Sequence, residues 1–146
     1  MPGFNFSLQK VLDLRRQKEE QAQMALASSQ RRLKDKQKEQ ERLQKELINC
    51  EQEFRSKKTL SRGDIWLWRQ YRQRLDAEIR ECNGAVRRLE SRVERQRREL
   101  VDRSKERELL ERFKENRKKA FDYEQKKEEQ KEFDETATTR YKNGTV

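Results

Sequence analysis

The chain has 146 residues, of which 45% are charged and 30% are hydrophobic, and its mean hydropathy is -1.49. This composition excludes a multilayered hydrophobic core, so the chain is either disordered or built from helices that bury only a narrow seam. The net charge of +10 permits an acidic partner such as nucleic acid or an anionic membrane surface, but basic and acidic residues alternate along the chain, which argues against a dedicated basic patch.

Helix-breaking residues are rare, and this favours the helical state. The single proline is Pro2, and the glycines are Gly3, Gly63, Gly84 and Gly144. No helix breaker lies between Phe4 and Leu60. We therefore predict one all-α domain over residues 1–146, folded as a long antiparallel two-helix coiled-coil hairpin.

The first helix is expected over about residues 5–57, where apolar residues recur with heptad spacing. One heptad position carries Asn5, Leu12, Glu19, Leu26, Leu33, Gln40, Leu47 and Phe54. The other carries Leu8, Arg15, Ala22, Ser29, Lys36, Leu43, Cys50 and Lys57. This mostly apolar stripe between charged flanks predicts a coiled-coil seam that is weakest from Ser29 to Gln40.

The turn is expected at about residues 58–64, where Ser61 or Asp64 is placed to cap the next helix. A connection this short returns the second helix antiparallel to the first. The implied register pairs residues whose numbers sum to about 122. It places Phe54 on Trp68, Leu47 on Leu75, Leu33 on Leu89 and Leu12 on Leu110.

The second helix is expected over about residues 65–140. One position of its seam carries Ile65, Arg72, Ile79, Val86, Val93 and Leu100, and the other carries Trp68, Leu75, Cys82, Leu89 and Gln96. Beyond Arg103 the apolar residues move to Leu109, Leu110, Phe113, Ala120 and Phe121, which predicts a frame slip of about one residue and a looser seam. From about residue 122 the helix overhangs its partner, so the tail is expected to find another partner or to fray.

Two local features leave their interpretation open. Gly84, in mid-helix, marks a kink, a site of close packing or no structural role. Beside the turn, Phe54 and Trp68 fit the seam, but Trp66 and Tyr71 cannot both fit it because successive helical residues point about 100° apart. At least one of these two is expected to be exposed, either to dock a partner or to pack locally.

Nothing in the sequence indicates catalysis or a bound cofactor. The chain has no histidine and no Gly-rich phosphate loop, and its two cysteines, Cys50 and Cys82, are expected about 15 Å apart along the axis, too far for a disulfide. They are interpreted as small hydrophobic residues of the seam rather than as zinc ligands. No apolar run approaches the ~20 residues that span a bilayer, and the N-terminus lacks a signal-peptide core, so a soluble cytoplasmic non-enzyme is predicted.

Both ends of the chain resemble a known family. The opening run Phe4-Asn5-Phe6-Ser7-Leu8-Gln9-Lys10-Val11-Leu12-Asp13-Leu14-Arg15 resembles the N-terminal signature of the flagellar export protein FliJ family. The run Leu109-Leu110-Glu111-Arg112-Phe113-Lys114-Glu115, then Tyr123-Glu124 and residues 128–137, resembles the family's C-terminal segment. Length and basic character match as well, so the resemblance covers essentially the whole chain.

The resemblance implies a component of the flagellar type III protein export apparatus at the cytoplasmic face of the basal body. Family members are similar to the central stalk of rotary ATPases, and the paired N- and C-terminal ends of their helices enter the pore of the hexameric export ATPase. The opposite end of the hairpin engages the cytoplasmic domain of the membrane export gate. Some members also escort export chaperones, and contact with the membrane is expected only through partners.

This resemblance implies two sets of partner-binding residues. The end that faces the export ATPase would comprise Phe4, Phe6, Leu8, Leu12, Leu110, Phe113, Phe121 and Tyr123. The end that faces the export gate would comprise Leu43, Leu47, Cys50, Phe54, Trp66, Tyr71 and Leu75.

Two other functions remain open on the sequence. A basic coiled coil that binds nucleic acid would bind with a steep dependence on salt, whereas the export interpretation predicts no specific nucleic acid. A scaffold that self-associates through its seam would be oligomeric, whereas a hairpin closed within one chain is expected to be a monomer.

Overall fold

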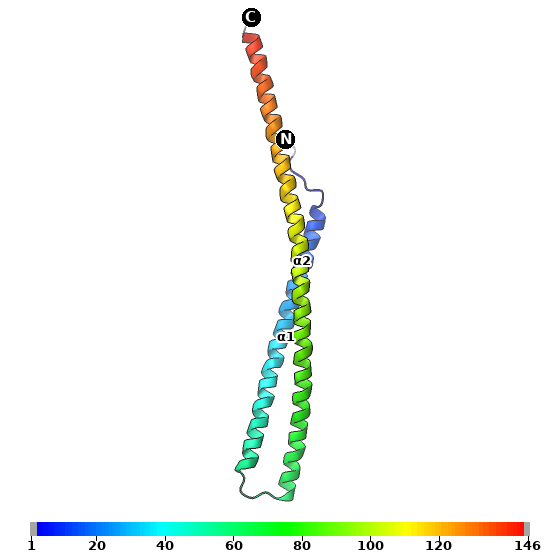
Figure 1. Cartoon of the computed structure of the whole chain (residues 1–146), viewed down its shortest axis with the longest axis vertical. Helices are drawn as coiled ribbons and strands as arrows, with labels where there is room; N and C mark the ends of the chain where they lie inside the picture. Colours follow the sequence, from blue (N-terminus) through cyan, green and yellow to red (C-terminus); the bar gives the residue numbers. More distant parts are fainter. Residues whose placement is uncertain (1–2, 145–146) are drawn as a thin grey trace. The chain divides into compact units, whose positions relative to one another are not determined.

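The structure is a computed structural model, and it describes residues 3–144. In this range the chain forms two helices and no strand: α1 (Gln9–Ser56, 48 residues) and α2 (Arg62–Gly144, 83 residues). The chain divides into two compact units, unit 1 with Met1–Glu19 and Asp102–Val146, and unit 2 with Glu20–Val101. In each unit α1 lies antiparallel to α2 (Figure 1), which confirms the predicted helical hairpin.

Both helices bury the stripe that the heptad spacing predicts. Every predicted seam position of α1 from Leu12 to Phe54 is buried or half-buried, and the same spacing holds on α2 from Ile65 to Lys114. The buried hydrophobic residues are Phe6, Leu12, Ala22, Leu43, Leu75, Cys82, Val86, Val93 and Leu110. Because each helix contributes one stripe, the core is a single layer of facing side chains.

The predicted register is confirmed where contacts test it. Phe54 stacks on Trp68 with ring centroids 4.0 Å apart. Leu47 packs on a cluster that contains Leu75, and Leu12 shares a second cluster with Leu110. The pairing of Leu33 with Leu89 stays a prediction.

A polar layer interrupts the apolar seam of unit 2 at Gln40. The side-chain amide of Gln40 donates a hydrogen bond of 2.6 Å to Asn83 Oδ1 on the facing helix. One turn away, Cys82 is buried and its thiol donates to the Lys36 carbonyl oxygen, while Cys50 is half-buried, and both cysteines are free as expected. A polar pair satisfied in only one alignment favours a single register over slipped alternatives.

The helix bounds differ from the predicted ones at both N-termini. Ser61 caps α2, because the Asp64 N–H donates to Ser61 Oγ (3.1 Å) and the Ser61 N–H donates to Asp64 Oδ2 (3.2 Å). This reciprocal capping box starts the helix at Arg62, earlier than the predicted residue 65. Helix α1 begins at Gln9 rather than at about residue 5, since Asn5 and Ser7 favour non-helical backbone and the segment before Gln9 instead buries Phe6.

The expected frame slip beyond Arg103 is not observed. Half-buried or buried side chains continue at Arg103, Arg107, Leu110 and Lys114, which keeps the heptad spacing, whereas Leu109 is 66% exposed. Basic residues occupy seam positions here, and their aliphatic stems bury while their charged ends reach polar partners. The apolar pattern therefore shifts although the seam does not.

The C-terminal segment has no partner on α1, as predicted, and it is helical, while its expected fraying stays a prediction. Helix α2 continues to Gly144, and every residue from Lys126 to Gly144 is exposed. Local interactions support it, including a bond from Gln130 Nε2 to Asp134 Oδ1 (3.1 Å). The helix also continues through Gly84, where an added Cβ would meet only the end of the Arg88 side chain at 3.4 Å, so neither a break nor close packing explains this glycine.

We expect Leu43→Ala to destabilise the hairpin by about 2 to 5 kcal/mol, because Leu43 is 1% exposed and its removal leaves a cavity in a core one layer deep. Leu67→Ala is the matched control, since Leu67 is 61% exposed and should change stability by less than about 0.5 kcal/mol. Urea denaturation followed by circular dichroism measures both. Equal midpoints for the two variants would contradict the assigned seam.

Candidate functional site

Unit 1 carries an aromatic cluster where the N-terminal segment crosses α2. Phe4 lies against Phe121 with ring centroids 5.6 Å apart, and Phe6 lies against Phe113 at 5.9 Å. The guanidinium of Arg117 sits over the Phe113 ring, 5.1 Å from its centroid. A groove of about 400 Å³ runs beside these rings, so the N-terminal segment and α2 form one surface.

The predicted ATPase-facing residues divide into surface and core. Phe113 and Tyr123 are 39% and 66% exposed, Leu8 is also exposed, and Phe4 and Phe121 are half-buried beside the groove. The other three, Phe6, Leu12 and Leu110, form the buried core of unit 1. In the isolated chain these three residues pack the seam and support the surface without forming it, so their role as ATPase contacts stays a prediction.

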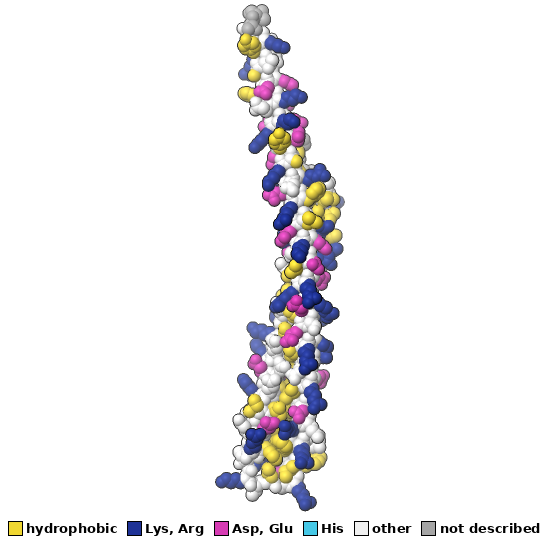
Figure 2. All heavy atoms as spheres, viewed as in Figure 1, with side chains coloured by type: hydrophobic (Ala, Val, Ile, Leu, Met, Phe, Trp, Pro, Cys, Tyr) yellow, Lys and Arg dark blue, Asp and Glu magenta, His cyan; other side chains and the backbone are white. Residues whose placement is uncertain are grey.

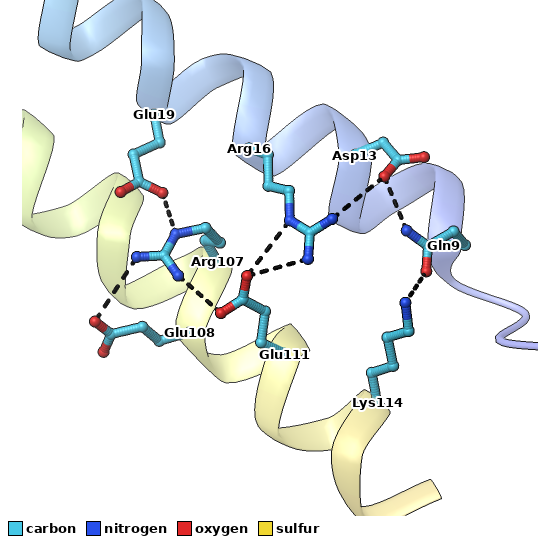
Figure 3. A network of polar contacts seen from close by, with 8 residues as sticks. All are labelled: Gln9, Asp13, Arg16, Glu19, Arg107, Glu108, Glu111 and Lys114. Carbon is cyan, nitrogen blue, oxygen red and sulfur yellow. Dashed lines mark hydrogen bonds and ion pairs between the residues drawn. The ribbon is translucent and has the colours of Figure 1, made fainter. Parts of the chain in front are cut away.

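A polar network joins the helices of unit 1 around a carboxylate in the seam (Figure 3). Glu19 is 9% exposed and occupies a heptad core position. Its carboxylate accepts hydrogen bonds from Arg107 Nε and from Ser104 Oγ, the latter at 3.0 Å. Arg107 also donates to Glu111 at 2.8 Å, so one guanidinium bridges carboxylates of both helices.

The network continues toward the N-terminus of α1. Arg16 pairs with Glu111 at 3.2 Å, and Lys114 Nζ donates to Gln9 Oε1 at 2.6 Å. Gln9 in turn donates to Asp13 at 2.9 Å. The contacts of Arg16 with Glu111 and of Lys114 with Gln9 cross between the helices and fix the first turns of α1 against α2 (Figure 3).

The pairing of Glu19 with Arg107 shifts the pKa of both groups. The hydrogen bond from Arg107 lowers the pKa of Glu19 below its usual value of 4.5, although burial acts in the opposite direction. The same bond raises the pKa of Arg107. The sequence showed Glu19 at a core position, and a charged residue there is the signal that could have revealed a partner on the facing helix.

Unit 2 carries an aromatic groove beside the turn, with a volume of about 430 Å³. Its apolar walls are Cys50, Phe54, Leu67, Trp68 and Tyr71, and we call this set the turn groove. The stacked pair of Phe54 and Trp68 forms one wall. Burial raises the pKa of the Cys50 thiol, so this cysteine behaves as an apolar lining residue.

A cation in the seam contacts the same wall. The Arg72 guanidinium lies 5.3 Å from the centroid of the Trp68 ring and pairs with Glu51 of the facing helix at 3.3 Å. Carboxylates of Glu46 and Glu53 also line the groove. An apolar floor with acidic edges suits a partner that presents apolar side chains beside basic ones.

The predicted gate-facing residues are only partly brought together by this groove. Cys50, Phe54 and Tyr71 line it, whereas Leu43 and Leu75 are buried core residues and Leu47 packs on them, so the contact of these three with the gate stays a prediction. Trp66 is 62% exposed but does not line the groove. Sequence reasoning missed Leu67, whose position next to the seam residue Trp68 but off the heptad stripe was the available signal.

Charged side chains of both signs are scattered along the visible face (Figure 2), and hydrophobic side chains gather near the turn and beside the N-terminal segment. No group of three His, Cys, Asp or Glu side chains within residues 3–144 is arranged to hold a metal ion. No helix in the described part of the chain is long and apolar enough to cross a membrane.

Comparison with known proteins identifies the family. The sequence model of the family described as Flagellar FliJ protein matches residues 4–145, nearly the whole chain. The chain belongs to the FliJ family. Neither the curated proteins nor the solved structures gave a match.

Membership of the FliJ family makes the chain a component of the flagellar export apparatus, and the resemblance seen at both ends of the sequence is confirmed. The family is non-catalytic, so the two surfaces are interpreted as interaction sites and not as active sites.

We expect Glu19→Gln to destabilise the chain at neutral pH by on the order of 1 kcal/mol, because it weakens a charge-assisted hydrogen bond in the seam. The folded pKa of Glu19 is lowered, so between that pKa and 4.5 the unfolded chain binds more protons than the folded one. The stabilisation is fully present above about pH 4.5 and is lost as the pH falls through the folded pKa.

Urea denaturation of both proteins at several pH values checks this expectation. The difference between wild type and Glu19→Gln should shrink as the pH falls below 4.5. Glu20→Gln, at an exposed neighbouring position, serves as the control and should match wild type throughout. A difference between wild type and Glu19→Gln that stays constant down to acid pH would contradict the ion-pair assignment.

Proposed function

We propose that the chain is the non-catalytic stalk of the export apparatus, which stimulates the hexameric export ATPase and links it to the cytoplasmic domain of the export gate. The site of action would be the cytoplasmic face of the flagellar basal body. Family membership supports the export role, and the two exposed apolar surfaces support contacts with two partners. Escort of export chaperones stays a prediction.

The exposed C-terminal part of α2 supports the proposed contact with the ATPase. Residues Lys126–Gly144 are exposed on every side, yet the helix is continuous and presents Phe133 and Tyr141 at 72% and 75% exposure. An isolated helix with aromatic residues on its surface is stabilised when a ring of subunits buries it. The aromatic cluster of unit 1, with its polar network, would hold the N-terminal segment beside this helix as it enters the ring.

The turn groove supports the proposed contact with the gate. Tyr71 is 42% exposed and Leu67 is 61% exposed, and both lie beside the stacked rings of Phe54 and Trp68. Exposed aromatic residues around a preformed apolar groove are typical of interaction hot spots. This surface belongs to unit 2 and the proposed ATPase surface belongs to unit 1, so one chain could bind both partners at the same time.

The family assignment favours this function over the nucleic-acid-binding alternative. Both explanations accept a net charge of +10, but only the export role accounts for the sequence pattern matched over residues 4–145. Binding to nucleic acid would then be weak and nonspecific. A closed hairpin would leave the isolated chain monomeric.

Truncation after Asp122 tests the proposal. The shortened chain keeps Phe121 on Phe4 and the buried core of unit 1, so helicity and unfolding of the hairpin should persist. Stimulation of the purified export ATPase should be lost, because the exposed helix is gone. Full stimulation by the truncated chain would overturn the stalk assignment.

Point variants of the full chain localise the same effect. Tyr123 and Leu109 are each 66% exposed on α2, so Tyr123→Ala and Leu109→Ala remove comparable exposed surface. Tyr123→Ala should weaken ATPase binding, whereas Leu109→Ala should not. Equal effects would indicate that the binding surface lies elsewhere on α2.

A further inference from the structure

Trp66 lies beside the turn but outside the turn groove. Its side chain is 62% exposed, and the aromatic walls of the groove are Phe54, Trp68 and Tyr71. Leu67, next to it in sequence, is 61% exposed. Leu67 also lines the turn groove, whereas the apolar area of Trp66 is explained by neither the seam nor the gate contact.

Several basic residues lie close to these two in the sequence, and one of them, Lys57, is near enough to Asp64 to help lower the pKa of that carboxyl. Arg55, Lys57, Lys58, Arg62 and Arg69 are all exposed, and none of the ion pairs found within residues 3–144 involves them. The one carboxylate between residues 55 and 69 is that of Asp64, which caps α2. The alternation of charge that holds elsewhere along the chain therefore breaks at the turn.

The cations and the apolar residues share one end of unit 2. Arg62, Trp66 and Arg69 follow the i, i+4, i+7 spacing that places residues on one helix face. Lys57 and Lys58 belong to the loop just before that helix begins. Figure 2 shows Lys and Arg side chains projecting at the turn beside a group of hydrophobic ones.

Acidic residues bound this basic surface on both helices. Away from the turn carboxylates return, at Glu51 and Glu53 on α1 and at Asp76 and Glu78 on α2. A nucleic acid lying along the helices would meet these acidic side chains, whereas a flat anionic surface would meet only the end of unit 2. The charge distribution thus favours end-on contact with a surface over lengthwise contact with a polymer.

We propose that the turn tip, defined as Lys57, Lys58, Arg62, Trp66, Leu67 and Arg69, binds the headgroup region of an anionic lipid bilayer. Tryptophan favours the membrane interface because its ring is apolar and its N–H is polar. Lysine and arginine are attracted by the negative surface potential of anionic lipids. Together they supply the two signals, apolar insertion and charge, that reversible membrane binding requires.

This inference goes beyond the proposed function. Lipid contact through Trp66 would occur beside the turn groove and would leave Phe54, Trp68 and Tyr71 available to the gate. It adds a direct contact with the membrane to contacts made through partners. Its failure would leave the ATPase and gate assignments untouched, because stimulation of the ATPase in solution involves no lipid.

Co-sedimentation of the full chain with vesicles tests the proposal. Vesicles of phosphatidylglycerol and phosphatidylcholine should retain the chain, and vesicles of phosphatidylcholine alone should not. Each cation near the surface increases partitioning of the chain onto anionic vesicles about fivefold. The double variant Lys57→Gln, Lys58→Gln should therefore lower this partitioning about 25-fold. Trp66→Ala should lower it several-fold while helicity by circular dichroism stays unchanged.

Matched variants distinguish binding by the turn tip from nonspecific binding caused by the net positive charge of the chain. Arg87→Gln with Arg88→Gln removes the same charge from exposed positions on α2 away from the turn, and Tyr71→Ala removes an aromatic residue of the groove. Both should retain most of the binding. An equal loss in the arginine variant, or equal retention on phosphatidylcholine alone, would overturn the proposal.

Tryptophan fluorescence provides a second readout. The chain has two tryptophans, so Trp68→Phe leaves Trp66 as the sole emitter. Brominated lipids in anionic vesicles should quench its emission and shift it to the blue. No quenching by bound vesicles, or duplex DNA binding more tightly than vesicles and insensitive to Trp66→Ala, would also overturn the proposal.

Discussion

The single seam between α1 and α2 is the constraint on which the rest of the structure depends. A chain with 30% hydrophobic residues can form two long packed helices only if the apolar residues of each helix lie on one stripe. The capping box at Ser61 and Asp64 and the polar pair of Gln40 and Asn83 then set where that stripe turns back and how it aligns. Little apolar surface is left over, so the places where it stays exposed are informative.

Those places belong to different parts of the chain and have different chemistry. In unit 1, aromatic residues of the N-terminal segment lie beside a seam partly filled by ionic contacts, with Glu19 and Arg107 taking positions that leucine would occupy in a simple coiled coil. Such a pair contributes less to stability than apolar packing would, but it is satisfied in one alignment only. In unit 2, stacked rings line a groove, and cations gather at the turn itself.

Periodicity predicted the architecture because a heptad repeat fixes which side chains face each other. Phe54 and Trp68 were paired correctly, and the overhang was placed near residue 122. The positions of apolar residues did not predict burial where basic residues fill the seam. The aliphatic stems of Arg103, Arg107 and Lys114 occupy seam positions, and a search for hydrophobic residues alone does not find them. The predicted site includes Leu43 and Leu75, which are core residues of the isolated chain, because a list of apolar residues does not separate those that form the core from those that form a surface.

Native-state hydrogen exchange on the isolated chain tests the central claim most directly, that one seam stabilises the facing stretches of both helices and nothing packs on the C-terminal segment. Amides facing the seam between Leu12 and Phe54 and between Ile65 and Leu110 should be strongly protected. Amides of residues Lys126–Gly144 should exchange almost as fast as those of an isolated helix. Protection of that segment equal to the seam's, or weak protection throughout both helices, would contradict the account.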